Sequence, residues 1–223
     1  VGSEMCIRDS VWPVDCGQIL IDGKDISALP EHKRAPYLGR VFQDPMTGTV
    51  ADMEIIENLA IAARRGKKRG LSWGVKADER FRYRQMLAEF DLGLEDRMSS
   101  KVGLLSGGQR QAITLLMATI KKPKLLLLDE HTAALDPKTA AKVLELSDKI
   151  IAENNLTALM VTHNMHDAIT HGNRLIMMSD GKIILDISGE EKKNLTVEHL
   201  LEMFEKASGS KLENDRMLLS KDK

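Results

Sequence analysis

The chain has 223 residues, of which 43% are hydrophobic and 29% are charged, a composition typical of a soluble globular protein with one sizeable domain. Its formal net charge of -1 gives no electrostatic reason to expect nucleic acid or an anionic membrane as a partner. Cys6 and Cys16 lack metal-type spacing, and no apolar stretch is long enough to cross a bilayer, so a role at a membrane would require another chain.

The first half of the chain is predicted to hold a hairpin, a short strand and two helices. The alternating stretch 17–27 contains an Asp-Gly pair and predicts the hairpin, and 38–44 predicts the strand. Apolar residues at helical spacing predict helices over 53–65 and 77–92. The basic segment 64–70 is interpreted as a solvated surface loop, with contact to a partner or to lipid headgroups as the alternative.

The second half of the chain has the pattern of an α/β core with a parallel sheet. The continuous apolar run in 124–130 predicts a strand buried on both faces, and 157–163 predicts another buried strand. Between them, 137–155 predicts a helix that begins with a proline. A second hairpin is predicted over 173–188, followed by a short helix near Thr196. Buried strands that alternate with helices indicate the parallel sheet.

A serine and two glycines open a predicted helix in the middle of the chain. Ser106 is a good N-cap, but Gly107 and Gly108 each cost the helix roughly 1 kcal/mol relative to alanine. The glycines make sense if the backbone must come very close to something. A helix N-terminus with bare N–H groups is an anion site, so we expect a phosphate there.

Polar side chains follow three predicted strands. Asp129 and Glu130 end the first buried strand, His163 ends the second, and Gln43 ends the early strand. One carboxylate can hold Mg²⁺ through water, and the next can take a proton from an attacking water. The histidine can meet a γ-phosphate, and the glutamine can sense the metal. The alternative for the two acids alone is that they cap the following loop in solvent.

These motifs, in this order, closely resemble those of the ATP-binding cassette (ABC) ATPases, the motor subunits of ABC transporters. The string LSGGQRQ at 105–111 matches the family's signature motif. LLLLDE at 125–130 resembles its Walker B strand with the catalytic glutamate, and AALD at 133–136 resembles its D-loop. Gln43 and His163 match its Q-loop and its switch histidine. The implied fold is α/β, a P-loop NTPase-type core with a parallel sheet plus an inserted helical subdomain at about 50–122.

The resemblance also implies the chemistry of the site. ATP would lie between the Walker A segment of one subunit and the signature motif of a second, with Ser106 on the γ-phosphate. Glu130 would polarise water and His163 would contact the γ-phosphate, as the catalytic residues. Mg²⁺ would be held by Asp129 and sensed by Gln43. The implied nucleotide-binding residues are Gln43, Leu105, Ser106, Gly107, Gly108, Gln109, Asp129 and Asp136, of which Asp136 would cross the dimer interface.

The family's partners follow from the same resemblance. We expect a homodimer of ABC ATPase subunits, peripheral on the cytoplasmic face of the membrane. The dimer would bind a transmembrane permease, which in turn would contact an extracytoplasmic solute-binding protein. No nucleic acid partner is expected. The details resemble bacterial importers found beside binding proteins of the aromatic-amino-acid kind, and some relatives carry a phosphonate label. Specificity lies in the permease and binding protein, so the substrate is expected only by analogy.

The sequence departs from the family in two places. It contains no G-x-x-x-x-G-K-[ST] string, the Walker A motif expected ahead of Gly17, and residues 1–10 have no counterpart in the family. We therefore expect a truncated, inactive chain with a non-native head, an ABC domain over 11–206 and a polar tail over 207–223. The alternatives are a degenerate or regulatory cassette and a soluble ABC ATPase of translation or DNA repair. Where the family most often has proline, His131 is expected to be structural, with tuning of the D-loop as the alternative.

Overall fold

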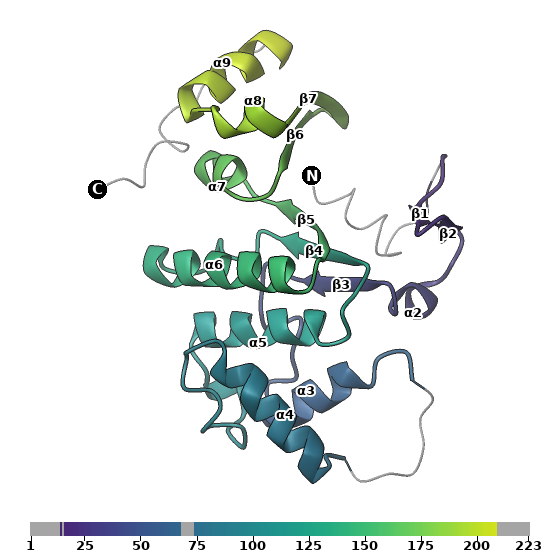
Figure 1. Cartoon of the computed structure of the whole chain (residues 1–223), viewed down its shortest axis with the longest axis vertical. Helices are drawn as coiled ribbons and strands as arrows, with labels where there is room; N and C mark the ends of the chain where they lie inside the picture. Colours follow the sequence, from purple (N-terminus) through teal and green to yellow (C-terminus); the bar gives the residue numbers. More distant parts are fainter. Residues whose placement is uncertain (1–13, 15, 68–73, 209–223) are drawn as a thin grey trace. The chain divides into compact units, whose positions relative to one another are not determined.

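The computed structural model describes residues 14, 16–67 and 74–208 (Figure 1). These residues form two compact units, the first ending at Met160 and the second beginning at Val161. The predicted non-native head at 1–10, the last three residues of the basic segment 64–70 and nearly all of the predicted polar tail lie outside the described residues. The predicted domain boundaries therefore stay predictions.

The first unit opens with the predicted hairpin. Strands β1 (Leu20–Ile21) and β2 (Lys24–Asp25) pair antiparallel around the Asp-Gly turn. Asp22 and Gly23 both have positive φ, 50° and 75°, the conformation that a tight two-residue hairpin turn requires. A short helix, α2 (Glu31–Arg34), follows the hairpin and was not predicted.

A three-stranded sheet forms the centre of the first unit, with β3 (Leu38–Val41), β4 (Leu125–Asp129) and β5 (Thr157–Val161) in that order. Strands β3 and β4 are parallel, as predicted, with Arg40 opposite Leu127. The three central leucines of β4 are all buried, which confirms the prediction of a strand covered on both faces.

The prediction that β5 is buried was wrong. Its first two residues are exposed and the other three are only partly buried. The strand lies at the edge of the three-stranded sheet, beside β4, so it has a neighbouring strand on one side only. An apolar run reports the preference of its side chains and not the position of its strand in the sheet.

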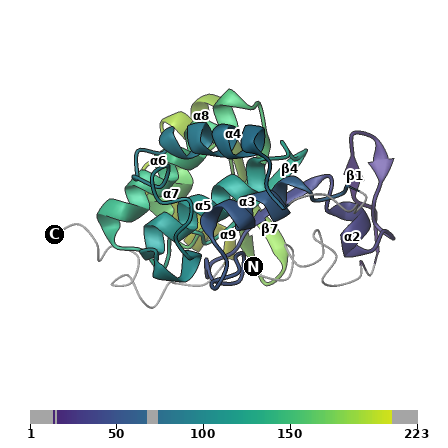
Figure 2. The ribbon, with the colours of Figure 1, turned by 90° about the horizontal axis from the view of Figure 1, so that it is seen from below.

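Helices occupy most of the first unit outside the sheet, namely α3 (Ile55–Ala63), α4 (Ala77–Ala88), α5 (Gly107–Thr119), α6 (Pro137–Glu153) and the 3₁₀ turn η1 (Val102–Leu104). Helix α5 packs against β3, α3 and α6, and α3 also packs against α4. Figures 1 and 2 show α3 and α4 on the side of α5 that faces away from the sheet. The described part of 50–122 contains no strand, as predicted, and its designation as a subdomain stays a prediction.

The second unit pairs a hairpin with helices, namely α7 (Met165–Thr170), β6 (Arg174–Ser179), β7 (Lys182–Ser188), α8 (Gly189–Lys193) and α9 (Val197–Ser208). The hairpin turns at the predicted Asp-Gly pair, and α9 confirms the predicted closing helix. The short α8 was not predicted. Its Lys192 is buried and donates hydrogen bonds to the carbonyls of Ile169, His171 and Gly172 at the end of α7. Burial lowers the pKa of this ammonium.

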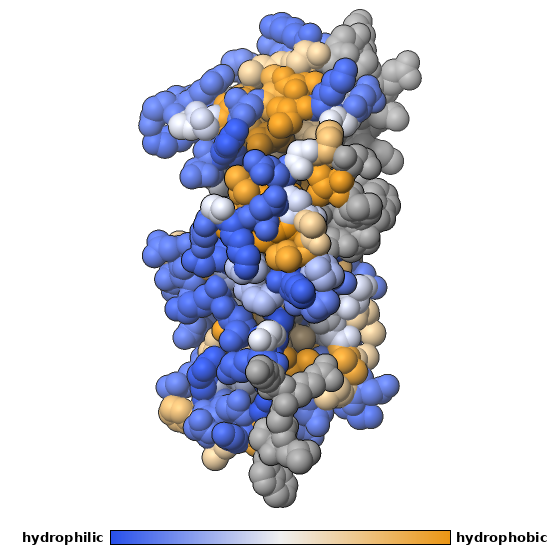
Figure 3. Space-filling view, turned by 90° about the vertical axis from the view of Figure 1, so that its right-hand side faces the viewer, coloured by the Kyte–Doolittle hydropathy of each residue, from blue (hydrophilic) through white to orange (hydrophobic). Residues whose placement is uncertain are grey.

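A small apolar core holds the second unit together, built on Leu175, Ile187, Leu195 and Leu200. Ile176 and Ile183 of the hairpin are 42% and 59% exposed, and Figure 3 shows apolar surface on this part of the chain. Among the described residues of both units, no helix combines the length and the apolar character needed to cross a membrane.

Candidate functional site

Gln43 and Glu130 meet at the carboxyl ends of two neighbouring parallel strands. The Gln43 Nε2 group donates a hydrogen bond of 3.1 Å to Oε2 of Glu130, although the two residues lie 87 positions apart. Parallel β3 and β4 end at the same edge of the sheet, which is why the loops after them meet there. The structure thus brings together two of the residues predicted for the site.

The backbone of Glu130 adopts an unusual conformation. Its φ is +42°, in the left-handed region that non-glycine residues rarely adopt. The Glu130 carbonyl accepts a hydrogen bond of 2.9 Å from the Ala133 amide, so the chain turns at once into the next loop. The turn leaves the Glu130 side chain beside Gln43, and such strained conformations are concentrated at functional sites.

Asp129 has a partner that sequence reasoning missed. Arg40 Nη2 lies 3.3 Å from Asp129 Oδ2, and the two side chains are only 19% and 24% exposed. The Arg40 guanidinium also lies over the ring of Phe42, 4.4 Å from its centroid. The available signal was a lone arginine inside the otherwise apolar strand LGRV.

His163 lies in the second unit and is exposed. It is followed by Asn164, whose side-chain oxygen accepts from the backbone amides of His166 and Asp167 and caps α7. The predicted contact of His163 with a γ-phosphate stays a prediction. His166 is exposed and His171 is half-buried.

The N-terminus of α5 carries a complete capping box. Ser106 Oγ accepts from the Gln109 amide at 3.3 Å, and Gln109 Oε1 accepts from the Ser106 amide at 3.2 Å. This confirms Ser106 as the predicted N-cap. Because the hydroxyl accepts in the cap, its own hydrogen stays available to an acceptor such as a phosphate oxygen. Gln109 Nε2 further donates to the Leu92 carbonyl at 3.3 Å, which fixes this end of the helix.

The two glycines of the signature motif have different surroundings. A Cβ atom on Gly108 would lie 2.1 Å from Cγ2 of Thr139, a distance that no packed side chain allows. A Cβ atom on Gly107 would meet only Leu135 Cδ2, at 3.3 Å. Gly108 is thus explained by packing against α6 within the same chain, which sequence reasoning did not foresee. Only Gly107 still calls for the approach of a ligand.

Asp136 caps the N-terminus of α6, beside that of α5. Its Oδ1 accepts from the Thr139 amide at 3.1 Å, and Pro137 occupies the first helical position, as predicted. Hydrogen bonds from the side chain and backbone of Thr139 hold the pKa of the Asp136 carboxyl below its usual value. Thr139 therefore touches two predicted site residues, Gly108 and Asp136.

His131 is buried, with only 2% of its surface exposed. Its Nε2 lies 3.1 Å from Ser147 Oγ, and the Ser147 hydroxyl donates to the Val143 carbonyl at 2.8 Å. Since the hydroxyl hydrogen is used by Val143, the Nε2–H group of His131 is the donor to Ser147. This contact ties the loop after Glu130 to the middle of α6 and favours a structural role for His131.

Arg110 joins the loop after Gln43 to the loop before the signature motif. Its guanidinium donates to the carbonyls of Val102, Gly103 and Leu105 at 3.1–3.3 Å and contacts the sulfur of Met46. The fixed fork of donors on a guanidinium allows one side chain to hold several carbonyls. Sequence reasoning missed this role because Arg110 stood inside a motif with another explanation.

The residues at the end of β4 fit Mg²⁺ in their chemistry. Asp129 and Glu130 supply carboxylate oxygens, and Gln43, whose amide nitrogen faces Glu130, has an amide oxygen left as a ligand. Within 16–67 and 74–208, no group of three or more His, Cys, Asp and Glu side chains forms a metal cage. Mg²⁺ rarely uses such a cage, since it keeps several waters and takes one or two carboxylates plus substrate phosphates.

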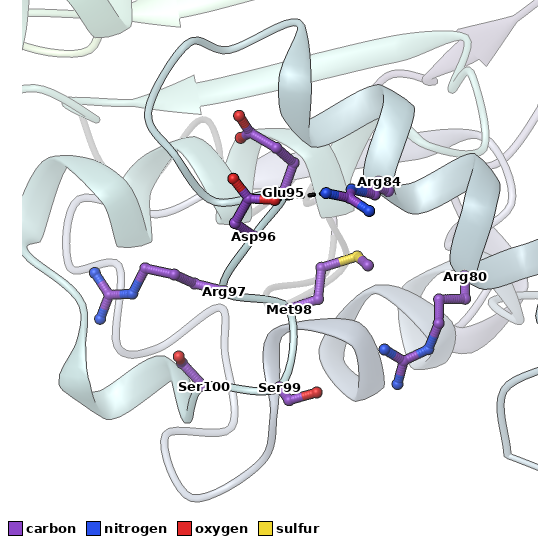
Figure 4. A pocket seen from close by; sticks show the side chains of 8 residues that line it. All are labelled: Arg80, Arg84, Glu95, Asp96, Arg97, Met98, Ser99 and Ser100. Carbon is purple, nitrogen blue, oxygen red and sulfur yellow. Dashed lines mark hydrogen bonds and ion pairs between the residues drawn. The ribbon is translucent and has the colours of Figure 1, made fainter.

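A hollow lies between α4 and the segment 95–100 (Figure 4). It has a volume of about 380 Å³ and is lined by charged and hydroxyl side chains together with Met98. Arg84 and Asp96 form an ion pair of 2.6 Å at its edge, with both side chains more than half exposed. No residue predicted for the site lines this hollow.

The sequence profile and the two similar proteins described next all belong to the ABC transporter family. The sequence profile described as ABC transporter matches residues 5–133. A tyrosine transport ATP-binding protein of Clostridioides difficile is 48% identical over 191 residues, which cover 86% of this chain and 76% of that protein. The spermidine/putrescine import ATP-binding protein PotA of Haemophilus influenzae is 34% identical over 178 residues, which cover 80% of this chain but only 45% of PotA.

Two solved structures have the same fold. An ATP-binding cassette of an ABC transporter in its ADP conformation superposes with a TM-score of 0.73 at 25% identity, over 91% of this chain and 82% of the other. A nucleotide-free ATP-binding cassette superposes with a TM-score of 0.70 at 25% identity, over 86% of this chain and 77% of the other. These likenesses confirm the predicted α/β fold of the P-loop NTPase type.

Proposed function

The chain belongs to the ABC transporter family and is an ABC ATPase subunit, and we propose that it drives a bacterial importer of amino-acid-like solutes. One observation carries the assignment of the reaction centre: Gln43 and Glu130 are hydrogen-bonded at the edge of the sheet where Asp129 also ends its strand. ATP hydrolysis needs positioned groups and charge stabilisation, and these side chains supply them.

The roles of these side chains follow from their chemistry. Asp129 and Gln43 would hold Mg²⁺, which when bound neutralises the charge of the phosphates. Glu130 accepts the proton of the attacking water, and the hydrogen bond from Gln43 Nε2 orients its carboxylate. His163 contacts the γ-phosphate in this proposal.

The signature motif would serve a second copy of the chain. The capped N-terminus of α5 presents backbone N–H groups and the Ser106 hydroxyl, which together favour a phosphate. We infer that this phosphate belongs to ATP held by the partner subunit in a homodimer, with contacts from Leu105, Gly107 and Gln109. Asp136, exposed at the start of α6, would reach across the interface.

The solute and the transport partners are proposed from the similarity to two importer subunits. A tyrosine transport protein at 48% identity supports an amino-acid-like solute, and a spermidine/putrescine import protein at 34% supports import. The subunit would then lie on the cytoplasmic face of the membrane, bound to a permease near the helices of 50–122. The permease would receive its solute from an extracytoplasmic binding protein.

The reaction centre is tested with Glu130→Gln. The variant is measured in a chain that carries a G-x-x-x-x-G-K-[ST] segment ahead of Gly17. We expect ATP turnover to fall by at least about a hundredfold, the usual scale for general-base catalysis, while ATP binding persists and a dimer accumulates. The control is Glu89→Gln at the exposed end of α4. Unchanged hydrolysis in Glu130→Gln would contradict the assignment.

The dimer is tested with Ser106→Arg in the same extended chain. A large cation at the capped helix end should prevent the ATP-bound dimer, which sedimentation would detect, and leave nucleotide binding by the monomer intact. A dimer that still forms normally would refute the trans-phosphate role. The importer itself is tested by co-purification with a permease encoded beside the gene, followed by solute uptake in vesicles with tyrosine and spermidine as probes.

A further inference from the structure

We propose that Arg40 is a positioning residue that holds the Asp129 carboxylate before the metal arrives and thereby sets how much Mg²⁺ the site requires. The inference deepens the proposed function, since it takes Asp129 as the carboxylate that holds Mg²⁺. It starts from the ion pair between β3 and β4, in which Arg40 Nη2 lies 3.3 Å from Asp129 Oδ2.

The register of the two strands explains why the pair forms. Arg40 lies opposite Leu127, and Asp129 follows two positions later on the same face of β4. A long side chain reaches such a diagonal neighbour across a sheet. Arg40 therefore extends toward the carboxyl ends of the strands, where the site lies. Its guanidinium is held over the Phe42 ring, 4.4 Å away, which limits the directions that it can take.

The surroundings make this pair more than a surface contact. The two side chains are 19% and 24% exposed, so water screens their attraction less than it screens an exposed pair such as Arg84–Asp96. Next to Asp129 stands a second carboxylate, Glu130, to which Gln43 contributes a hydrogen bond but no charge.

A metal ion at Asp129 must then share its ligand with an arginine. A divalent cation and a guanidinium on one carboxylate repel each other at a separation of a few ångströms. Arg40 therefore lowers the affinity of Asp129 for the metal, and it stabilises the carboxylate when no metal is present. The site would bind Mg²⁺ firmly only when nucleotide phosphates add their own oxygens, so that metal and nucleotide arrive together.

The test measures metal binding directly rather than turnover. Mn²⁺ is the probe because it takes oxygen ligands as Mg²⁺ does and its free form gives an EPR signal. We expect Arg40→Met, in the chain as printed, to bind Mn²⁺ at about fivefold lower concentration than the wild type, the scale on which one partly exposed ion pair changes an affinity. Arg40→Lys, which keeps the charge, should stay close to the wild type.

Two further variants locate the effect. Arg84→Met removes an arginine from the exposed Arg84–Asp96 pair and should leave Mn²⁺ binding unchanged. Arg40→Met combined with Asp129→Asn should lose the gained affinity. Equal Mn²⁺ midpoints for the wild type and Arg40→Met, or no binding by either, would overturn the inference. A gain that survives Asp129→Asn would also overturn it and would remove Asp129 from the proposed metal site. Arg40→Gln replaces Arg40→Met if circular dichroism shows that the methionine variant is unfolded.

Discussion

Gly108 lies so close to Thr139 that a side chain at position 108 would overlap the threonine methyl group unless one of the two helices shifted. A Cβ atom there would lie 2.1 Å from Thr139 Cγ2. The same Thr139 donates its amide hydrogen to Asp136, the N-cap of α6. The N-termini of α5 and α6 are thus joined through one threonine, which links the signature motif to the D-loop within a single chain.

The contact predicts a compensating pair of substitutions. Gly108→Ala should destabilise the chain by about 1–3 kcal/mol, because overpacking outweighs the better helix propensity of alanine. Thr139→Ser removes the methyl group at fault and keeps the hydroxyl, so the double variant should recover most of the loss. Urea unfolding of the two single variants and the double variant measures this. Gly107→Ala, with its nearest atom at 3.3 Å, is the control and should cost less. A double variant no more stable than Gly108→Ala would contradict the contact.

The hydrogen bonds from Arg110 to the carbonyls of Val102, Gly103 and Leu105 predict that Arg110 limits local opening of this segment. Arg110→Lys keeps the charge but has no planar fork to hold three carbonyls, so the segment 102–105 should open more often. Two amides report this opening, since those of Val102 and Gly103 donate to Met53 and Ala51 at 3.0 and 2.8 Å. We expect their hydrogen exchange to become about tenfold faster, equivalent to about 1.4 kcal/mol of lost protection. Arg84→Lys on α4 is the control. Equal hydrogen-exchange rates of the Val102 and Gly103 amides in both variants would show that Arg110 does not hold this segment.

The buried His131 predicts a measurable coupling with Ser147. His131→Ala should cost about 2–4 kcal/mol through lost packing, and Ser147→Ala about 1 kcal/mol. The double-mutant cycle should return a coupling of about 0.5–1.5 kcal/mol. His166→Ala is the matched control, because the His166 side chain is 76% exposed, and it should change stability by less than about 0.5 kcal/mol. A coupling near zero would mean that the hydrogen bond does not anchor the loop.

The cap at Asp136 predicts a dependence on pH. Its pKa in the folded chain is lowered, so its contribution to stability is present above its unfolded pKa and is lost as the pH falls through the folded value. NMR titration of the carboxyl should give a pKa below the ordinary value of an aspartate. Asp136→Asn keeps the cap without the charge, so its stability should fall less steeply than that of the wild type as the pH decreases below about 4. If the stabilities of the wild type and Asp136→Asn fall in parallel as the pH decreases, ionisation of Asp136 does not contribute to stability.

Local chemistry made much of the fold predictable. The Asp-Gly pairs gave both hairpin turns, Ser106 and Pro137 gave helix starts, and the leucine run gave β4. Each of these signals acts within a few residues of the chain. The meeting of Gln43 with Glu130 was also predictable, because parallel strands end at a common edge.

Contacts between distant residues could not be predicted in the same way. The exposure of β5 depends on its place in the sheet order, which an apolar run does not encode. The pairing of Arg40 with Asp129 depends on strand register, and the closeness of Gly108 to Thr139 depends on how α5 packs against α6. Small helices such as α8 lack the length at which periodicity becomes visible.

The left-handed backbone of Glu130 bears on any attempt to redesign this chain toward its family's usual sequence. A proline at 131 would push the preceding residue toward extended conformations with φ near −120°, far from the +42° of Glu130. Consensus mutagenesis at this position would therefore rotate the carboxylate away from Gln43 and remove the imidazole that His131 places against Ser147. In this chain the conformation of Glu130 and the residue at position 131 are therefore coupled, and a proline introduced at 131 would change both.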